Sequence, residues 1–107
     1  MTIEDKIREV QTLVGYDETA TTELVTVYLN IARDKINDRA YPFMEHKPAD
    51  VPARYDHLQC ELAVRGFLRR GGEGETNHEE NGVNRTYADT TDMDLLRRIV
   101  PFAAVRG

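Results

Sequence analysis

The chain of 107 residues has no tryptophan, no serine, a single cysteine and no long apolar run. The lone Cys60 cannot form an internal disulfide, and the N-terminus shows no basic region followed by an apolar run and a cleavage site. No apolar run approaches the ~18 residues that span a bilayer. These absences predict a protein folded in a reducing compartment, with no membrane partner and no serine nucleophile.

Clusters of basic residues are missing as well. No more than two Lys or Arg residues are adjacent, and the formal net charge is -5 at pH 7. Nonspecific binding to a phosphate backbone depends on clustered positive charge, so we do not expect it here, although an acidic surface would let nucleic acid slide past. The length and the 40% hydrophobic content predict one soluble domain over residues 1–107.

Four segments show the apolar periodicity of amphipathic helices. Thr2 and Asp5 stand in capping-box register before the first helix, and Gly15 follows it as a stop signal. Pro52 suits the opening of the third helix, where its missing N–H costs nothing. The fold class is therefore mainly α, a small four-helix bundle with helices at about 2–14, 18–39, 52–70 and 92–100.

Further expectations concern packing. The buried face of the second helix is predicted to contain Leu24, Val25, Tyr28, Ile31, Ala32, Lys35 and Ile36. Gly66 costs the third helix about 1 kcal/mol relative to alanine. It indicates either close approach of a neighbouring helix or simple tolerance, and tolerance is the favoured interpretation. The proline-rich stretch AYPFMEHKPADVPARY is expected to be an ordered loop that presses Tyr41, Phe43 and Met44 against the core.

A long loop and arm, residues 71–90, separate the third and fourth predicted helices. Its first part is rich in glycine and glutamate, and its last part, GVNRTYA, alternates in the period-two pattern of one short β-strand. A single strand leaves N–H and C=O groups that another chain can pair with. Residues 101–107 form an apolar C-terminal tail. Both features predict contacts between subunits.

The sequence contains no residue pattern that is adequate for a ligand-binding or catalytic site. The glycines of the loop follow a helix and are interspersed with glutamates, which disfavours a phosphate cradle, and the calcium-loop spacing fails as well. We therefore expect no catalytic residue, no metal site and no cofactor. Two alternatives remain: an enzyme that uses His57 and Cys60, although Cys60 looks like a core thiol, and a small nucleic-acid-binding or regulatory protein with a recognition helix. That helix would carry Arg65, Arg69 and Arg70.

One family resemblance covers most of the chain. The stretch LAVRGFLRRGGEGETNHEENGVNRTY resembles the helix, Gly-rich turn, polar loop and Gly-Val strand of the head-to-tail connector (adaptor) proteins of tailed bacteriophages and prophages. LVGYDETATTELVTVYLNIARDKINDRAYPF and LLRRIVPF are similar to the same family more weakly. The resemblance implies a structural virion protein, also called a DNA-packaging protein, without enzymatic activity.

The resemblance also implies partners and a place of action. The subunits would assemble into a closed ring, a dodecamer in the virion, between the portal protein and the stopper or head-completion protein. DNA would pass through the channel without sequence-specific binding. The protein would assemble in the host bacterial cytoplasm and remain at the head–tail interface of the virion. By position, the implied subunit and partner contacts are Gly72, Gly74, Glu75, Gly82, Val83, Arg85, Tyr87, Phe102 and Val105.

Overall fold

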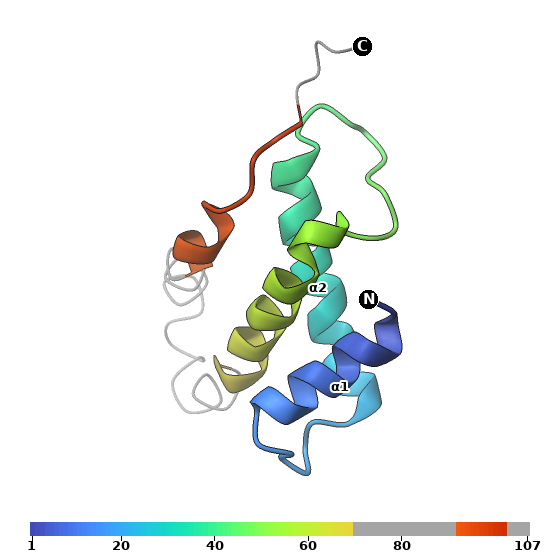
Figure 1. Ribbon diagram of the computed structural model, residues 1–107, viewed down its shortest axis with the longest axis vertical. Coiled ribbons are helices and arrows are strands. Elements are labelled where there is room, and N and C mark those ends of the chain that lie inside the picture. The colour runs from blue at the N-terminus through green and yellow to red at the C-terminus, as the bar shows by residue number, and fades with distance from the viewer. Residues whose placement is uncertain (70–91, 103–107) are drawn as a thin grey trace, which may run out of the picture.

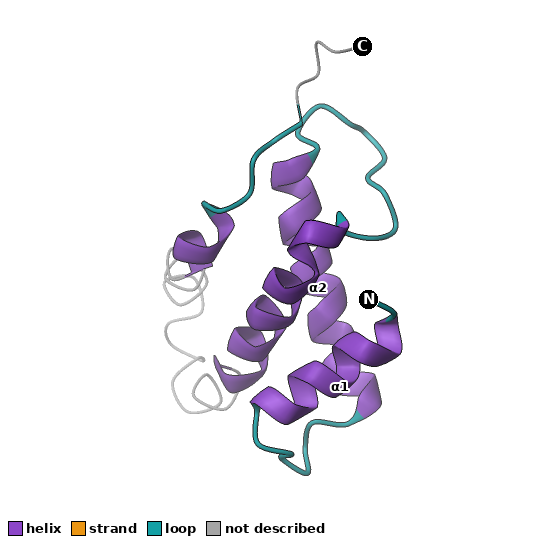
Figure 2. Ribbon diagram, viewed as in Figure 1, coloured by secondary structure: helices purple, strands orange, loops and turns teal. Residues whose placement is uncertain are grey.

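The computed structural model describes residues 1–69 and 92–102. Its elements are α1 (Ile3–Leu13), α2 (Thr22–Ala40), the 3-10 turn η1 (Ala53–Tyr55) that leads into a third helix at 56–69, and a short fourth helix at 92–96 (Figure 1). These ranges contain helices and loops but no strand (Figure 2). The prediction of a mainly helical bundle is confirmed, whereas the predicted strand falls outside the described residues.

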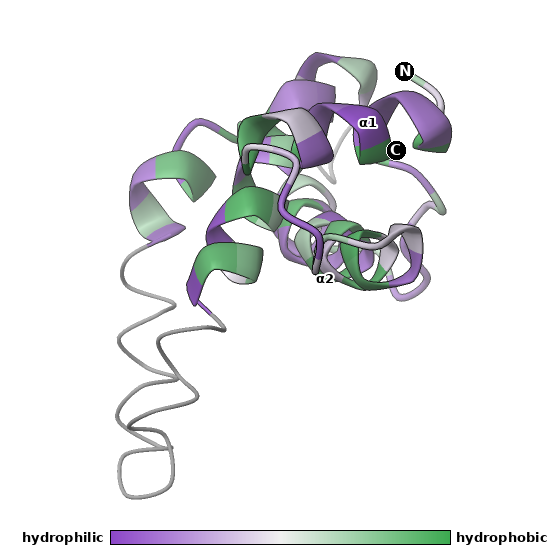
Figure 3. Cartoon of the chain, turned by 90° about the horizontal axis from the view of Figure 1, so that it is seen from below, coloured by the Kyte–Doolittle hydropathy of each residue, from purple (hydrophilic) through white to green (hydrophobic). Residues whose placement is uncertain are grey.

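Two antiparallel helices, α2 and the third helix, form the centre of the fold. α1 lies across one end of this pair, and the fourth helix lies on another side, at the left of Figure 1. The apolar sides of the helices face one another (Figure 3). One buried cluster lies beneath the fourth helix and contains Ala32, Ile36, Ala40, Val51, Tyr55, Leu58, Leu62, Leu95, Leu96 and Ile99. A second lies beneath α1 and contains Val10, Ala20, Val25, Leu29, Cys60, Ala63 and Phe67.

Both ends of the first helix are set by local side-chain hydrogen bonds and backbone conformation. The Thr2 hydroxyl accepts the backbone N–H of Asp5, and the Asp5 carboxylate accepts the N–H of Thr2, so the expected capping box is present. The chain then turns at Gly15, whose φ of +77° is a left-handed conformation suited to glycine. None of the helices described is long and apolar enough to cross a membrane.

The second helix differs from its predicted bounds and buried face. It starts at Thr22 rather than at residue 18, because the Thr21 hydroxyl caps it by accepting the N–H of Leu24. Its buried apolar residues are Val25, Leu29, Ala32, Ile36 and Ala40. The predicted face is therefore rotated: Ile31 is 44% exposed, while Leu29, absent from the prediction, is fully buried.

The fourth helix is also shorter than predicted, ending at residue 96 instead of 100. After Leu96 the backbone hydrogen bonds are of the 3-10 type. The N–H of Arg98 donates to the carbonyl of Leu95, and the N–H of Ile99 donates to the carbonyl of Leu96. The N–H of Val100 then leaves the helical pattern and donates to the Tyr55 hydroxyl, at 2.9 Å. Pro101 has no N–H to donate, so the helix does not resume after Val100.

The loop after α2 is fastened by a buried amide. The Asn37 side chain, which is 1% exposed, donates to the carbonyls of Pro48 and Asp50, both at 3.2 Å. Tyr41 packs against the core as expected. The expectation for Phe43 and Met44 was wrong, since they are 75% and 45% exposed. The loop is held by its polar backbone contacts, so its apolar tip need not be buried.

Gly66 of the third helix packs directly against the Tyr28 ring of α2. A Cβ atom at this position would lie 2.8 Å from Cδ1 and 3.3 Å from Cε1 of Tyr28. The first distance is shorter than real Cβ contacts, and the second is tighter than nine in ten of them. The interpretation of Gly66 as a merely tolerated residue is therefore wrong, because its missing side chain makes room for the Tyr28 ring.

We expect Gly66→Ala to lower the free energy of unfolding by about 1–3 kcal/mol through overpacking, despite the better helix propensity of alanine. In a Tyr28→Ala background the ring is gone, and the same change should raise stability by about 0.5–1 kcal/mol. Chemical denaturation of the four proteins of this cycle measures both values. An effect of equal size and sign in both backgrounds would show that the contact does not limit packing.

A buried polar cluster fastens α1 to the third helix. The Lys6 ammonium, whose side chain is 6% exposed, lies 3.1 Å from Oδ1 of Asp56 and 2.6 Å from Oε1 of Gln59. The Met1 ammonium lies 3.0 Å from Oδ2 of Asp56, and Gln59 also donates to the carbonyl of Leu29 on α2. Three helices therefore meet at one satisfied network.

Candidate functional site

Most of the contact residues predicted from the sequence lie outside the described residues. This holds for Gly72, Gly74, Glu75, Gly82, Val83, Arg85, Tyr87 and Val105. The described residues include Arg69 and Asp92, which flank residues 70–91, and one predicted contact residue, Phe102.

Asp92 is the centre of an ion-pair cluster next to this stretch. Its side chain is 1% exposed and lies 3.0 Å from the Lys35 ammonium of α2. Both of its oxygens also face the Arg69 guanidinium, at 3.3 and 3.2 Å, and Arg65 lies 3.9 Å away. Buried carboxylates are stable only when paired and hydrogen-bonded, and this one meets that condition with cations from two helices. We call Asp92, Lys35 and Arg69 the Asp92 clamp.

The Asp92 clamp joins two positions that are far apart along the chain. Arg69 immediately precedes residues 70–91, and Asp92 immediately follows them. Their two-pronged ion pair therefore brings both ends of this stretch to one place on the third helix. The sequence alone does not indicate the clamp, because the partners of Asp92 are 23 and 57 residues away.

A second ion pair continues the connection on the surface. The Arg65 guanidinium donates to both oxygens of Asp94, at 2.8 and 2.9 Å. This hydrogen bonding raises the pKa of Arg65 and lowers that of Asp94. Two of the three arginines offered as a recognition surface, Arg65 and Arg69, are thus engaged with aspartates of their own chain. Arg70 lies outside the described residues.

Phe102, the described contact residue, packs on its own chain at the C-terminal end of α2. Its ring stacks on Tyr41 with centroids 4.9 Å apart, and the Arg54 guanidinium lies 5.2 Å above it. The N–H of Phe102 donates to the carbonyl of Ala40, at 2.8 Å. The ring nevertheless stays 42% exposed. Both the backbone and the ring of Phe102 are therefore fixed at the C-terminal end of α2.

Cys60 and His57, the residues considered for thiol or metal chemistry, have structural surroundings. Cys60 is fully buried and lies 3.8 Å from the carbonyl of Lys6, and burial raises the pKa of its thiol to about 12. His57 is exposed, and its Nδ1 lies 2.9 Å from a carboxylate oxygen of Glu9, a hydrogen bond that raises its pKa. Within residues 1–69 and 92–102, no group of three His, Cys, Asp or Glu side chains could hold a metal ion.

Because the Cys60 thiol is buried and protonated, we expect it to react with thiol reagents at neutral pH on the order of 100-fold more slowly in the folded protein than in denaturant. Cys60→Ala should leave assembly unchanged. A colorimetric thiol assay with and without denaturant measures the first effect. Rapid labelling of the folded protein would contradict a core role.

Comparison with known proteins addresses the family directly. A family model described as "Phage gp6-like head-tail connector protein" matches residues 4–100. No significant match was found among curated proteins or among solved structures. The family match begins in α1 and ends just before Pro101, so it includes all four helices and residues 70–91. The chain therefore belongs to the phage gp6-like family of head–tail connector proteins, a structural family, as its resemblance indicated.

Proposed function

We propose that this protein is a structural component of the virion that forms a closed ring below the portal and joins the DNA-filled capsid to the stopper and tail proteins. The observation that carries the proposal is the family match over residues 4–100. In this proposal twelve copies close the ring and DNA passes through its channel. The net charge of -5 supports passage without sticking. The protein acts without enzymatic activity or cofactor, and it assembles in the host cytoplasm.

The contact residues belong to the same proposal. Positions Gly72 to Tyr87 contact the neighbouring subunit and the portal, and Phe102 and Val105 contact an adjacent ring. The Asp92 clamp supports this assignment, because it fixes both ends of residues 70–91 to the helical body. A segment anchored at both ends in this way can contact a neighbouring subunit while the helical core remains folded. Closing the ring also pairs a strand edge that would otherwise be open.

Assembly on purified portal protein tests the proposed function. We expect rings in electron micrographs of the mixture, and a complex of portal with several copies of the chain by native mass spectrometry. A chain that stays monomeric and never co-purifies with portal or stopper would contradict the proposal. Micromolar, salt-sensitive binding to duplex DNA would instead favour the nucleic-acid-binding alternative.

Substitutions in the predicted strand test the contact residues. Val83→Pro removes a backbone donor and Tyr87→Asp adds a charge, so each should abolish ring formation while the helical circular dichroism signal stays unchanged. Charge reversal at Glu79 or Glu80 is the matched control in the same loop and should leave assembly intact. Normal rings from both strand variants would show that this stretch is not the contact.

A further inference from the structure

The side of α2 that faces away from the core combines apolar and acidic residues. Spacings of four, four, three and four residues place them in one row along the helix. Val27 is 50% exposed and Ile31 is 44% exposed. This row, which we call the α2 outer face, consists of Glu23, Val27, Ile31, Asp34 and Asp38.

The acids of the α2 outer face are weakly held within the subunit. Among the described residues, Asp34 pairs only with the adjacent Arg33, and its side chain is 68% exposed. Asp38 lies 4.0 Å from the Lys47 ammonium and is 71% exposed. Exposed pairs of this kind contribute little to stability. Both carboxylates can therefore exchange these partners for others at small cost.

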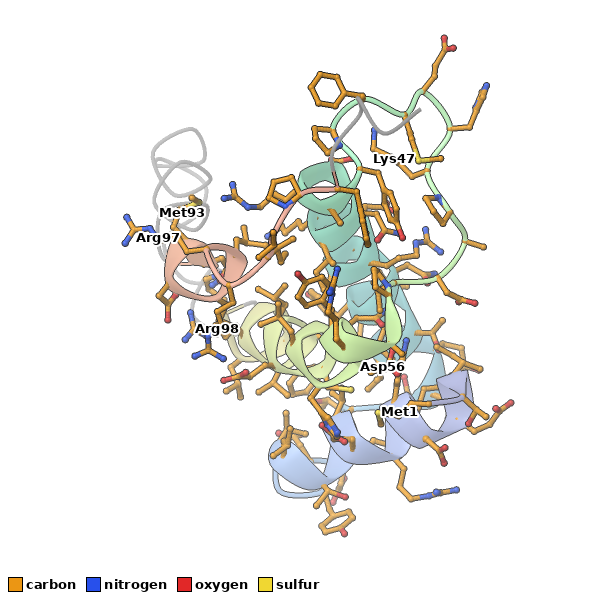
Figure 4. The ribbon with its side chains drawn as sticks, turned by 45° about the horizontal axis from the view of Figure 1, so that its top comes forward. Met1, Lys47, Asp56, Met93, Arg97 and Arg98 are labelled. Carbon is orange, nitrogen blue, oxygen red and sulfur yellow. The ribbon has the colours of Figure 1, made fainter. Side chains whose placement is uncertain are left out.

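A complementary surface lies on the fourth helix and the turn after it. Arg97 and Arg98 project away from the body there (Figure 4). Arg97 makes no side-chain ion pair or hydrogen bond among the residues that the structure describes, and Arg98 lies 3.7 Å from the exposed Glu61 carboxylate. Met93 is half-buried beside them and Val100 is 66% exposed. We call these residues, Met93, Arg97, Arg98 and Val100, the arginine face.

The two faces match each other in composition. Each has two apolar side chains, and one adds three carboxylates where the other adds two guanidiniums. No ion pair joins them within the described part of one subunit. The acidic α2 outer face would repel nucleic acid, which argues for a protein partner. The arginine face, which is complementary to it in charge, is present on the same polypeptide. Head-to-tail contact between two different faces is also what a closed ring requires.

We propose that the α2 outer face of one subunit docks on the arginine face of the next subunit. This inference rests on the proposed ring and names a subunit contact made by the helical core, in addition to that of residues 70–91. Opposite charges would set the register of the contact, and the apolar side chains would be buried at its centre.

Charge reversal on each face tests the contact. We expect Arg97→Glu with Arg98→Glu, and separately Asp34→Lys with Asp38→Lys, to raise the concentration needed for half-maximal ring assembly about tenfold or more. All four positions are exposed, so circular dichroism should show unchanged folding. Glu18→Lys with Glu45→Lys reverses two exposed charges elsewhere and should leave assembly close to wild type.

Mixing the two reversed variants gives the sharpest result. One variant has acidic charge on both faces and the other has basic charge on both, so neither can pair opposite charges with a copy of itself. A ring in which the two variants alternate would pair an acidic with a basic face at every contact. We expect rings with a one-to-one ratio of the variants by native mass spectrometry. Normal assembly of either variant alone, or failure of the mixture, would overturn this inference while leaving the ring intact. Failure of the wild-type chain to form rings, alone or on portal, would overturn the proposed function and the inference with it.

Discussion

Replacing Asp56 with alanine is expected to lower the free energy of unfolding by about 3–5 kcal/mol, because it leaves the buried Lys6 ammonium without its counter-ion. Within the described part of the chain, Lys6 would keep only the Gln59 oxygen as a partner, and its side chain is 6% exposed. The Met1 ammonium loses its partner in the same variant. Urea denaturation followed by circular dichroism measures the change.

Two further variants separate the buried charge from general damage to the helix. Adding Lys6→Met to Asp56→Ala removes the orphaned charge and should recover much of the loss, although Gln59 then lacks one donor. Glu61→Ala removes a carboxylate from the same helix that is 50% exposed, and it should change stability by less than about 0.5 kcal/mol. A double variant no more stable than Asp56→Ala would contradict the buried-charge explanation.

The same network predicts how stability depends on pH. Burial tends to raise the pKa of Asp56, but hydrogen bonds from the Met1 and Lys6 ammonium groups outweigh it, and the net pKa is lowered. The contribution of Asp56 to the free energy of unfolding is therefore complete above the pKa of an unfolded Asp, about 3.9, and is lost as pH falls through the pKa of the folded state. The raised pKa of His57 acts in the opposite sense. Its contribution to stability is complete below the pKa of an unfolded His, about 6.5, and is lost as pH rises through the pKa of the folded state.

Asp92→Ala is the second substitution with a large expected effect, a loss of about 2–4 kcal/mol. It leaves Lys35 and Arg69 facing each other without the carboxylate between them. Because these side chains are 31% and 23% exposed, water can recover part of their solvation, so we expect a smaller loss than at Asp56. Denaturation measures the total, and hydrogen exchange at residues 97–99, whose N–H groups donate to carbonyls of the fourth helix, should show that this helix opens first.

Asp94→Ala is the matched control for the Asp92 clamp. It removes a carboxylate from the same helix that also binds an arginine of the third helix, but at an exposed position. We expect a much smaller effect than for Asp92→Ala, and no faster exchange at residues 97–99. Equal effects of the two substitutions would show that burial at Asp92 does not determine how the fourth helix is held.

Much of the fold could be predicted because it depends on near neighbours in the chain. The capping box of Thr2 and Asp5 spans three residues, and the stop at Gly15 needs only a glycine with positive φ. The family was also recognisable from the sequence, and the match over residues 4–100 confirms it. By contrast, the proposed contact residues between 72 and 87 were predicted from pattern and resemblance alone, and they stay predictions.

The sequence by itself determined the helices, through apolar periodicity and capping, and the family, through its motifs. Only the tertiary structure decided which helix faces are buried, where Gly66 admits Tyr28, and which charges are paired inside. Leu29 and Ile31 are similar in hydropathy, so the second helix alone does not specify which of them turns inward. Lys6 and Asp92 likewise look like surface charges until Asp56, Lys35 and Arg69 are brought beside them. The physical reason is that burial and ion pairing arise between segments distant in sequence, whereas periodicity and capping act within a few residues.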